Sequence, residues 1–144
     1  MKRLMIAVLM NAVVGVSSLL AADSLIGTWK TVDEKTGKVQ SDVELYDQGG
    51  KLFGKITRLT EPNRADGKPK ICTKCQGADK DQPVVGLVIL KNMSASGDRY
   101  KGGTITDPED GKVYKAEIWS EDGKLKVRGY LGPFYRTQTW VKGN

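Results

Sequence analysis

Residues 112–142 read KVYKAEIWSEDGKLKVRGYLGPFYRTQTWVK, and this stretch decides the fold class. Apolar and polar side chains alternate over short runs, which is the period of a β-strand with one buried face. Turn-forming residues interrupt the alternation at 120–123 and at 132–133. The stretch therefore predicts three antiparallel strands joined by hairpins, over residues 112–119, 124–131 and 134–142.

The same alternation continues toward the N-terminus, and no segment there keeps a helical period over ten or more residues. It predicts five further strands, over residues 25–32, 39–46, 51–59, 86–93 and 100–106. About eight sequential antiparallel strands indicate an all-β fold. We expect an up-and-down barrel, because closure removes exposed strand edges, with a two-sheet β-sandwich as the alternative.

The first 22 residues have the pattern of a secretory signal peptide. Lys2 and Arg3 precede an apolar run over residues 4–20, and small residues follow at Ala21 and Ala22. The run is long enough for an uncleaved membrane anchor as the alternative. Cleavage would leave residues 23–144 as a single β-barrel domain without a membrane span, and would lower the formal charge from +6 to +4.

The composition excludes several kinds of site. The chain has no histidine, which excludes Ser-His-Asp and Cys-His nucleophile systems and histidine-ligated metals. Its two cysteines are too few for a four-cysteine zinc or iron–sulfur site. The basic residues lack the aromatic interleaving of nucleic-acid binding motifs. We therefore expect no enzyme, no metal, no cofactor and no nucleic-acid partner.

Six short motifs together resemble a known family. They are Gly27–Lys30, Gly50–Ile56, Cys72–Gly77, Gly103–Pro108, Val127–Gly132 and Arg136–Trp140. The chain is similar to a bacterial family of small exported proteins classed as a domain of unknown function, with a lipocalin-like (calycin) β-barrel. The resemblance implies that fold and export to a Gram-negative periplasm or secretion, and it implies no activity. In the wider superfamily the first-strand Trp, here Trp29, closes one barrel end, and a basic residue of the last strand, here Arg136, often packs on it.

The last strand can face the interior in two ways. Either Arg136, Gln138 and Trp140 point inward, or the alternate residues from Tyr135 to Val141 do. A buried charge needs partners, so an inward Arg136 would be either a packing clamp or a ligand anchor. The candidates for ligand binding or barrel closure are Trp29, Tyr114, Arg136, Gln138 and Trp140.

The Cys72-x-x-Cys75 motif lies in a segment, residues 60–83, that has no strand pattern. In an exported protein an even number of cysteines indicates a disulfide. The alternatives are a redox-active pair and a two-thiolate metal site. The segment is longer than most irregular loops, so it is either a lid over one barrel mouth or a surface excursion.

These observations leave three function hypotheses. The first is non-catalytic binding of a small, partly apolar or amphipathic ligand, because an eight-stranded barrel has room for one at most. The second is a structural envelope-interaction module with a filled barrel, which meets anionic envelope components through Lys124, Lys126 and Arg128. It is favoured by seven Lys/Arg against three Asp/Glu in residues 112–142. The third is a thiol–disulfide protein that uses Cys72 and Cys75.

Overall fold

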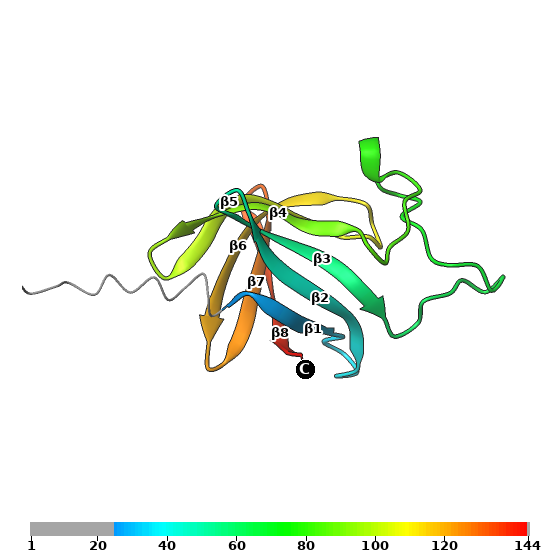
Figure 1. The fold of residues 1–144 in the computed structure, drawn as a ribbon, viewed down its shortest axis with the longest axis horizontal. Coiled ribbons are helices and arrows are strands. Elements are labelled where there is room, and N and C mark those ends of the chain that lie inside the picture. Colours follow the sequence, from blue (N-terminus) through cyan, green and yellow to red (C-terminus); the bar gives the residue numbers. More distant parts are fainter. Residues whose placement is uncertain (1–24, 144) are drawn as a thin grey trace, which may run out of the picture.

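Eight antiparallel strands close into one barrel in the computed structural model, which describes residues 25–143 (Figure 1). Each strand pairs with its neighbour in sequence and β8 returns to β1, so the barrel is confirmed and the sandwich alternative is wrong. The predicted signal peptide lies outside the described residues. The strands are β1 (Gly27–Val32), β2 (Val39–Gln48), β3 (Lys51–Leu59), β4 (Val88–Ser96), β5 (Arg99–Thr106), β6 (Val113–Glu121), β7 (Lys124–Leu131) and β8 (Phe134–Lys142).

The strand bounds follow the sequence pattern closely, except at β4. Gly49 and Gly50 form the two-residue turn between β2 and β3 with φ of 62° and 81°, which glycine adopts without strain because it has no Cβ. The fourth strand was expected over residues 86–93 and runs over Val88–Ser96 instead. Asn92, with φ of 58°, sits where the register between β3 and β4 shifts, and this irregularity carries the strand past the end of the apolar run.

Side chains fill the barrel interior. Residues opposite one another on paired strands share a face, so the pairs Val43–Ile56, Leu52–Met93 and Ile118–Val127 point inward together. Seven inner side chains are only 0–1% exposed: Val43, Leu45, Leu52, Leu90, Met93, Ile118 and Leu125. A water-sized void beside them would leave accessible surface on them. This part of the barrel is therefore a packed core rather than a cavity.

The closing seam between β1 and β8 is short. Within residues 25–143, the ladder joins only Trp29 to Lys142 and Lys30 to Val141, and the Gly143 N–H donates to the Thr28 carbonyl at 2.8 Å. β7 pairs with β8 over a longer stretch, from Leu131 opposite Phe134 to Leu125 opposite Trp140. The barrel is thus tied at the end where β1 begins, and the two strands separate toward the other end, which we call the mouth.

The segment between β3 and β4 leaves the barrel and folds on itself (green in Figure 1). The Cys72 N–H donates to the Gln82 carbonyl at 2.8 Å, and the Val84 N–H donates to the Lys70 carbonyl at 3.0 Å. A 3₁₀ turn, η1 (Gly77–Asp79), forms its far end. Residues 60–87 therefore form an ordered excursion with its own backbone hydrogen bonds.

Candidate functional site

The inner face of β8 consists of Arg136, Gln138 and Trp140. These residues lie opposite Gly129, Val127 and Leu125 of β7, of which Val127 and Leu125 are buried in the core. Of the two orientations open from the sequence, the first is correct. Exposure rises along this face from buried Trp140 through half-buried Gln138 to exposed Arg136. The face therefore passes from a closed apolar end to a polar mouth.

Trp29 and Trp140 are buried near the end of the barrel where the seam is tied. Their exposures are 3% and 2%. The Trp29 Nε1–H donates to the Leu25 carbonyl at 2.9 Å, and the Trp140 Nε1–H donates to Gln138 Oε1 at 3.3 Å. Both indoles thus bury their rings while satisfying their polar atoms.

Arg136 does not stack on Trp29, contrary to what the resemblance implied. Its side chain is 71% exposed, and its Nη2 donates to Glu34 Oε2 at 2.9 Å. The ion pair raises the pKa of Arg136 through the hydrogen bond and charge of Glu34. The physical reason is distance along the strand: Arg136 lies at the mouth, whereas Trp29 pairs with Lys142 at the tied end. Arg136 therefore bridges the open part of the seam.

Tyr114 lies near Arg136 on the inner side of the mouth. A Cβ built on Gly129, which pairs with Arg136, would be 3.3 Å from the Tyr114 Cβ. The Tyr114 hydroxyl donates to Asp110 Oδ2 at 2.6 Å. This hydrogen bond, with burial and the charges of Asp110 and Asp107, raises the pKa of Tyr114 to about 12. The phenol therefore stays protonated at neutral pH, and its hydroxyl already donates a hydrogen bond to Asp110.

Cys72 and Cys75 form the expected disulfide. Both residues are buried, at 0% and 2% exposure. The Cys72 Sγ lies 3.6 Å from the Pro108 carbonyl in the β5–β6 turn. Thiol–disulfide exchange requires access to a sulfur atom, so this burial favours a structural clip over a redox-active pair.

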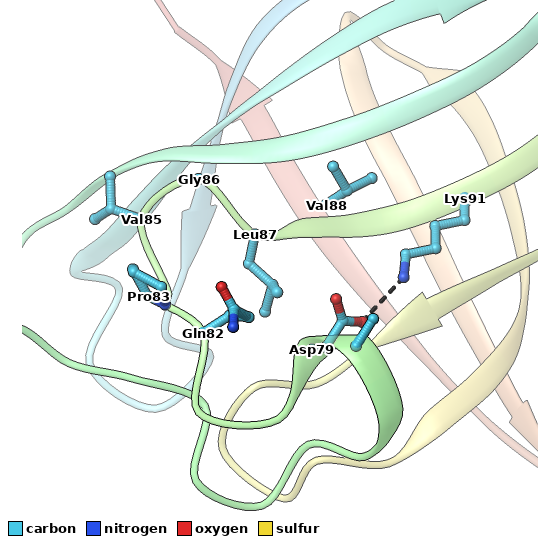
Figure 2. A pocket seen from close by; sticks show the side chains of 9 residues that line it. Asp79, Gln82, Pro83, Val85, Gly86, Leu87, Val88 and Lys91 are labelled. Carbon is cyan, nitrogen blue, oxygen red and sulfur yellow. Dashed lines mark hydrogen bonds and ion pairs between the residues drawn. The ribbon is translucent and has the colours of Figure 1, made fainter.

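The long segment also forms a groove with β4, shown in Figure 2. The depression has a volume of about 480 Å³. Pro83, Val85 and Leu87 contribute apolar surface, and Lys91 of β4 reaches Asp79 of η1 at 3.0 Å. That ion pair ties the far end of the segment to the barrel wall. The groove is open and mixed in polarity, with Asp79, Gln82 and Lys91 as its polar side chains.

The outer face of β5, β6 and β7 is strongly cationic. Its residues alternate with the inner ones, as the pairs Glu117–Arg128 and Trp119–Lys126 show. The face carries six cations and two carboxylates: Arg99, Lys101, Lys115, Lys124, Lys126 and Arg128 against Glu117 and Glu121. We call these eight residues the cationic face. It includes the three basic residues selected from the sequence.

Arginine and aromatic side chains interleave across this face. The Arg99 guanidinium lies 4.1 Å from the Trp119 ring centroid, and the Arg128 guanidinium lies 4.8 Å from the same ring. Arg128 also lies 4.4 Å from the ring centroid of Tyr135 on β8. These cation–π contacts connect four neighbouring strands. They order two of the six cations in fixed positions.

Glu117 anchors the middle of the cationic face. It accepts hydrogen bonds from Arg99 Nη1 at 2.8 Å and from the Tyr130 hydroxyl at 2.9 Å. Burial raises the pKa of Glu117, but these two bonds and the charge of Lys101 outweigh it, so the pKa is lowered. Beside it lies a depression of about 570 Å³ over Gly102, Gly103 and Ala116. Its walls include Lys101 and Lys115, which place two cations beside one carboxylate.

Two comparisons place the chain among known proteins. Residues 27–142 match the model of a family described as uncharacterized proteins conserved in bacteria (DUF2147). The chain belongs to this family. It is also similar to a solved structure, Protein HP1028 from the human pathogen Helicobacter pylori, which is described as belonging to the lipocalin family. That match has a TM-score of 0.68, with 21% identity over 83% of each chain. No curated protein matches the chain.

The family match agrees with the resemblance found in the sequence motifs, and the lipocalin-like barrel agrees with the fold. At 21% identity the structural match shows the fold alone. Residues 25–143 hold no group of three or more acidic or cysteine side chains placed to bind a metal ion. In the same residues, no helix has the length and apolar character to span a bilayer.

Sequence reasoning found Lys124, Lys126 and Arg128 but missed the other half of the cationic face. Arg99, Lys101 and Lys115 lie on β5 and β6, and they join the face only through strand pairing. The alternation in β6 is a usable signal, because Lys115, Glu117 and Trp119 alternate with the inward residues Tyr114, Ala116 and Ile118. The register of β5 against β6 shifts between Tyr100 and Gly103. The sequence alone does not reveal this shift, so it does not predict which β5 residues lie beside those of β6.

Proposed function

We propose that this protein is a non-catalytic binding module of the bacterial envelope that meets an anionic partner through its cationic face. The observation that carries the proposal is the six-to-two excess of cations over carboxylates on one side of a filled barrel. Export rests on the signal-peptide pattern of residues 1–22. Non-catalytic binding rests on the lack of histidine, and on the ion pairs that hold Glu117, the most enclosed carboxylate of the face.

The filled interior directs the search for a ligand to the surface. An eight-stranded barrel is either filled by its own side chains or holds one small ligand. Here seven inner side chains, among them Val43, Leu90 and Leu125, have almost no accessible surface. A ligand therefore has room at the mouth or outside the barrel, and the outer wall offers the larger charged area.

The cationic face suits a partner with repeated negative charges. Surface cations on one side of a molecule create a local positive potential that attracts anions and weakens with added salt. Arg99 and Arg128 are held by Trp119, so they lose little side-chain freedom on binding. Phosphate or carboxylate groups spaced along a polymer or arrayed on a surface would engage several cations at once.

Binding to anionic probes with charge-matched variants tests this proposal. We expect the protein to bind polyphosphate and vesicles containing phosphatidylglycerol, with affinity that falls as salt rises. Lys124→Gln/Lys126→Gln should weaken binding severalfold. Lys35→Gln/Lys38→Gln removes the same charge from the exposed β1–β2 turn and should weaken it less. Equal effects of the two double variants, or no binding to either probe, would count against the proposal.

A second candidate is the small, partly apolar or amphipathic ligand of the first hypothesis, bound at the mouth. It is favoured by the inward polar face of Gln138 and Arg136 beside Tyr114, above an apolar core. Native mass spectrometry of gently purified protein tests it. A bound small molecule that is lost in Gln138→Ala would support this candidate, and a ligand-free mass would oppose it.

A further inference from the structure

Most of the exposed large hydrophobic side chains gather at one corner of the barrel. Six such residues occur in the described chain, and four of them belong to the mouth end of β6, β7 and β8. These four are Val113, Leu131, Phe134 and Tyr135, with exposures of 59%, 55%, 76% and 62%. Single exposed apolar residues are ordinary, but a cluster at one place marks an interaction surface.

Strand pairing brings the four residues together. Leu131 lies opposite Phe134 and Tyr130 lies opposite Tyr135 across the β7–β8 hairpin. Lys115 lies opposite Tyr130, so Val113, two residues earlier on β6, is level with the hairpin turn. Opposite residues share a face, so Tyr135 and Val113 lie on one face of the sheet, and Leu131 and Phe134 lie on the other. The turn formed by Leu131, Gly132, Pro133 and Phe134 therefore projects two apolar side chains from a single face. We call it the hairpin tip.

Cations flank the hairpin tip. Arg136, which is 71% exposed and forms an ion pair with Glu34, follows Phe134 on β8 after one intervening residue. Arg128 lies 4.4 Å from the ring centroid of Tyr135. Lys112 and Lys115 are exposed on the adjoining strand and turn. The acidic side chains of that turn include Asp107 and Asp110, which accept hydrogen bonds within their own turn, and Glu109, which is exposed.

The tip is also preorganised. A two-residue turn of Gly132 and Pro133 connects strands that pair without interruption from Leu131–Phe134 to Leu125–Trp140, so little order must be gained on binding. Tyr130 and Tyr135 lie behind it with ring centroids 5.9 Å apart. Tyrosine rings have an apolar body and a polar hydroxyl, which suits the level of lipid head groups.

We infer that the hairpin tip inserts into the interfacial region of an anionic phospholipid bilayer, with Leu131 and Phe134 among the acyl chains and the flanking arginines at the head groups. The inference rests on the proposed function and names its partner. Apolar side chains that enter a membrane interface and cations that attract anionic lipids act together in peripheral proteins. A soluble polyanion would use the cations but leave the exposed Phe134 without a role.

Vesicle partition of the full mature chain tests the inference. We expect binding to vesicles of phosphatidylcholine with phosphatidylglycerol, and much weaker binding to pure phosphatidylcholine. Leu131→Ser/Phe134→Ser should reduce partition about tenfold or more, because apolar burial is lost at both positions. Ile26→Ser/Val85→Ser is the matched control, since these are the two exposed hydrophobic residues outside the corner, and it should change partition less than about twofold.

A spectroscopic readout separates insertion from surface attraction. Phe134→Trp should show quenching by lipids brominated on their acyl chains beyond that of the three native tryptophans. Circular dichroism should find the serine variants folded, because the changed side chains are exposed.

The outcomes distinguish this inference from the proposed function. If the tip variant binds vesicles as the wild type does, or if the wild type binds polyphosphate but no vesicle, insertion is overturned while the cationic face stands. If the wild type binds neither probe, both proposals fail. If the tip variant abolishes self-association of a chain that ignores vesicles, the occupant is a second copy and the inference is also overturned.

Discussion

Gly111 is one of the residues at which the long segment 60–87 meets the barrel. A Cβ there would lie 1.9 Å from the Lys74 carbonyl oxygen, and the φ of Gly111 is +70°. We expect Gly111→Ala to lower the free energy of unfolding by about 2 kcal/mol or more, because left-handed strain and displacement of the loop both contribute. Urea unfolding followed by tryptophan fluorescence measures the loss.

Gly97 provides the control for this prediction. Its φ is +62°, but nothing lies within 4 Å of the Cβ that alanine would add. Gly97→Ala should therefore cost only the left-handed strain, about 1–2 kcal/mol. Equal losses at the two positions would mean that the segment does not pack against Gly111.

Glu117 makes the stability of the cationic face depend on pH. Its pKa is lowered in the folded state, because the bonds from Arg99 and Tyr130 outweigh burial. A lowered folded pKa stabilises the protein above the unfolded pKa of about 4.3, and this contribution is lost as pH falls through the folded pKa. We expect Glu117→Gln to lower the melting temperature at pH 7, with the difference shrinking below about pH 4.

Melting curves from pH 7 to pH 3 check this dependence. Glu109→Gln makes the same change at an exposed turn position and should alter the melting temperature little. A deficit of Glu117→Gln that is as large at pH 3 as at pH 7 would show that shape, rather than charge, makes Glu117 important.

At the scale of the elements, Trp119 connects β5 to β8 through the two arginines that lie on its faces. Cation–π contacts of this kind contribute about 0.5–2 kcal/mol each, depending on how far they are desolvated. We expect Trp119→Leu to destabilise the protein by about 1–2 kcal/mol, because Arg99 loses its aromatic partner and Arg128 keeps only its contact with Tyr135. Urea unfolding measures the change, and Trp119→Phe should recover part of it. Stability unchanged in Trp119→Leu would show that the stack forms without strengthening the sheet.

At the scale of the molecule, the barrel could be predicted because its determinants are local. Alternation as in Tyr114, Ala116 and Ile118 reports one buried face, and glycine-rich turns such as Gly49–Gly50 place the hairpins. The partner of Arg136 could not be predicted, because Glu34 lies 102 residues away and meets it only across the closing seam. The sequence also did not predict whether side chains fill the barrel interior, since this depends on the volumes of side chains from all eight strands.

The filled interior is itself open to measurement. Leu90 is fully buried, and its Cβ lies 3.0 Å from the position that a Cβ on Gly54 would take, so the two strands interlock there. In a packed core, Leu90→Ala should cost about 2–5 kcal/mol, because lost burial is joined by a cavity. Leu131→Ala, at an exposed position, should cost no more than about 0.5 kcal/mol.

A small apolar probe such as benzene should then raise the melting temperature of Leu90→Ala and leave the wild type unchanged, since only the variant has a dry cavity to fill. A wild-type chain stabilised by the probe, or a loss below about 1 kcal/mol in Leu90→Ala, would indicate a barrel with internal space, and the ligand would then be sought inside it rather than on the cationic face.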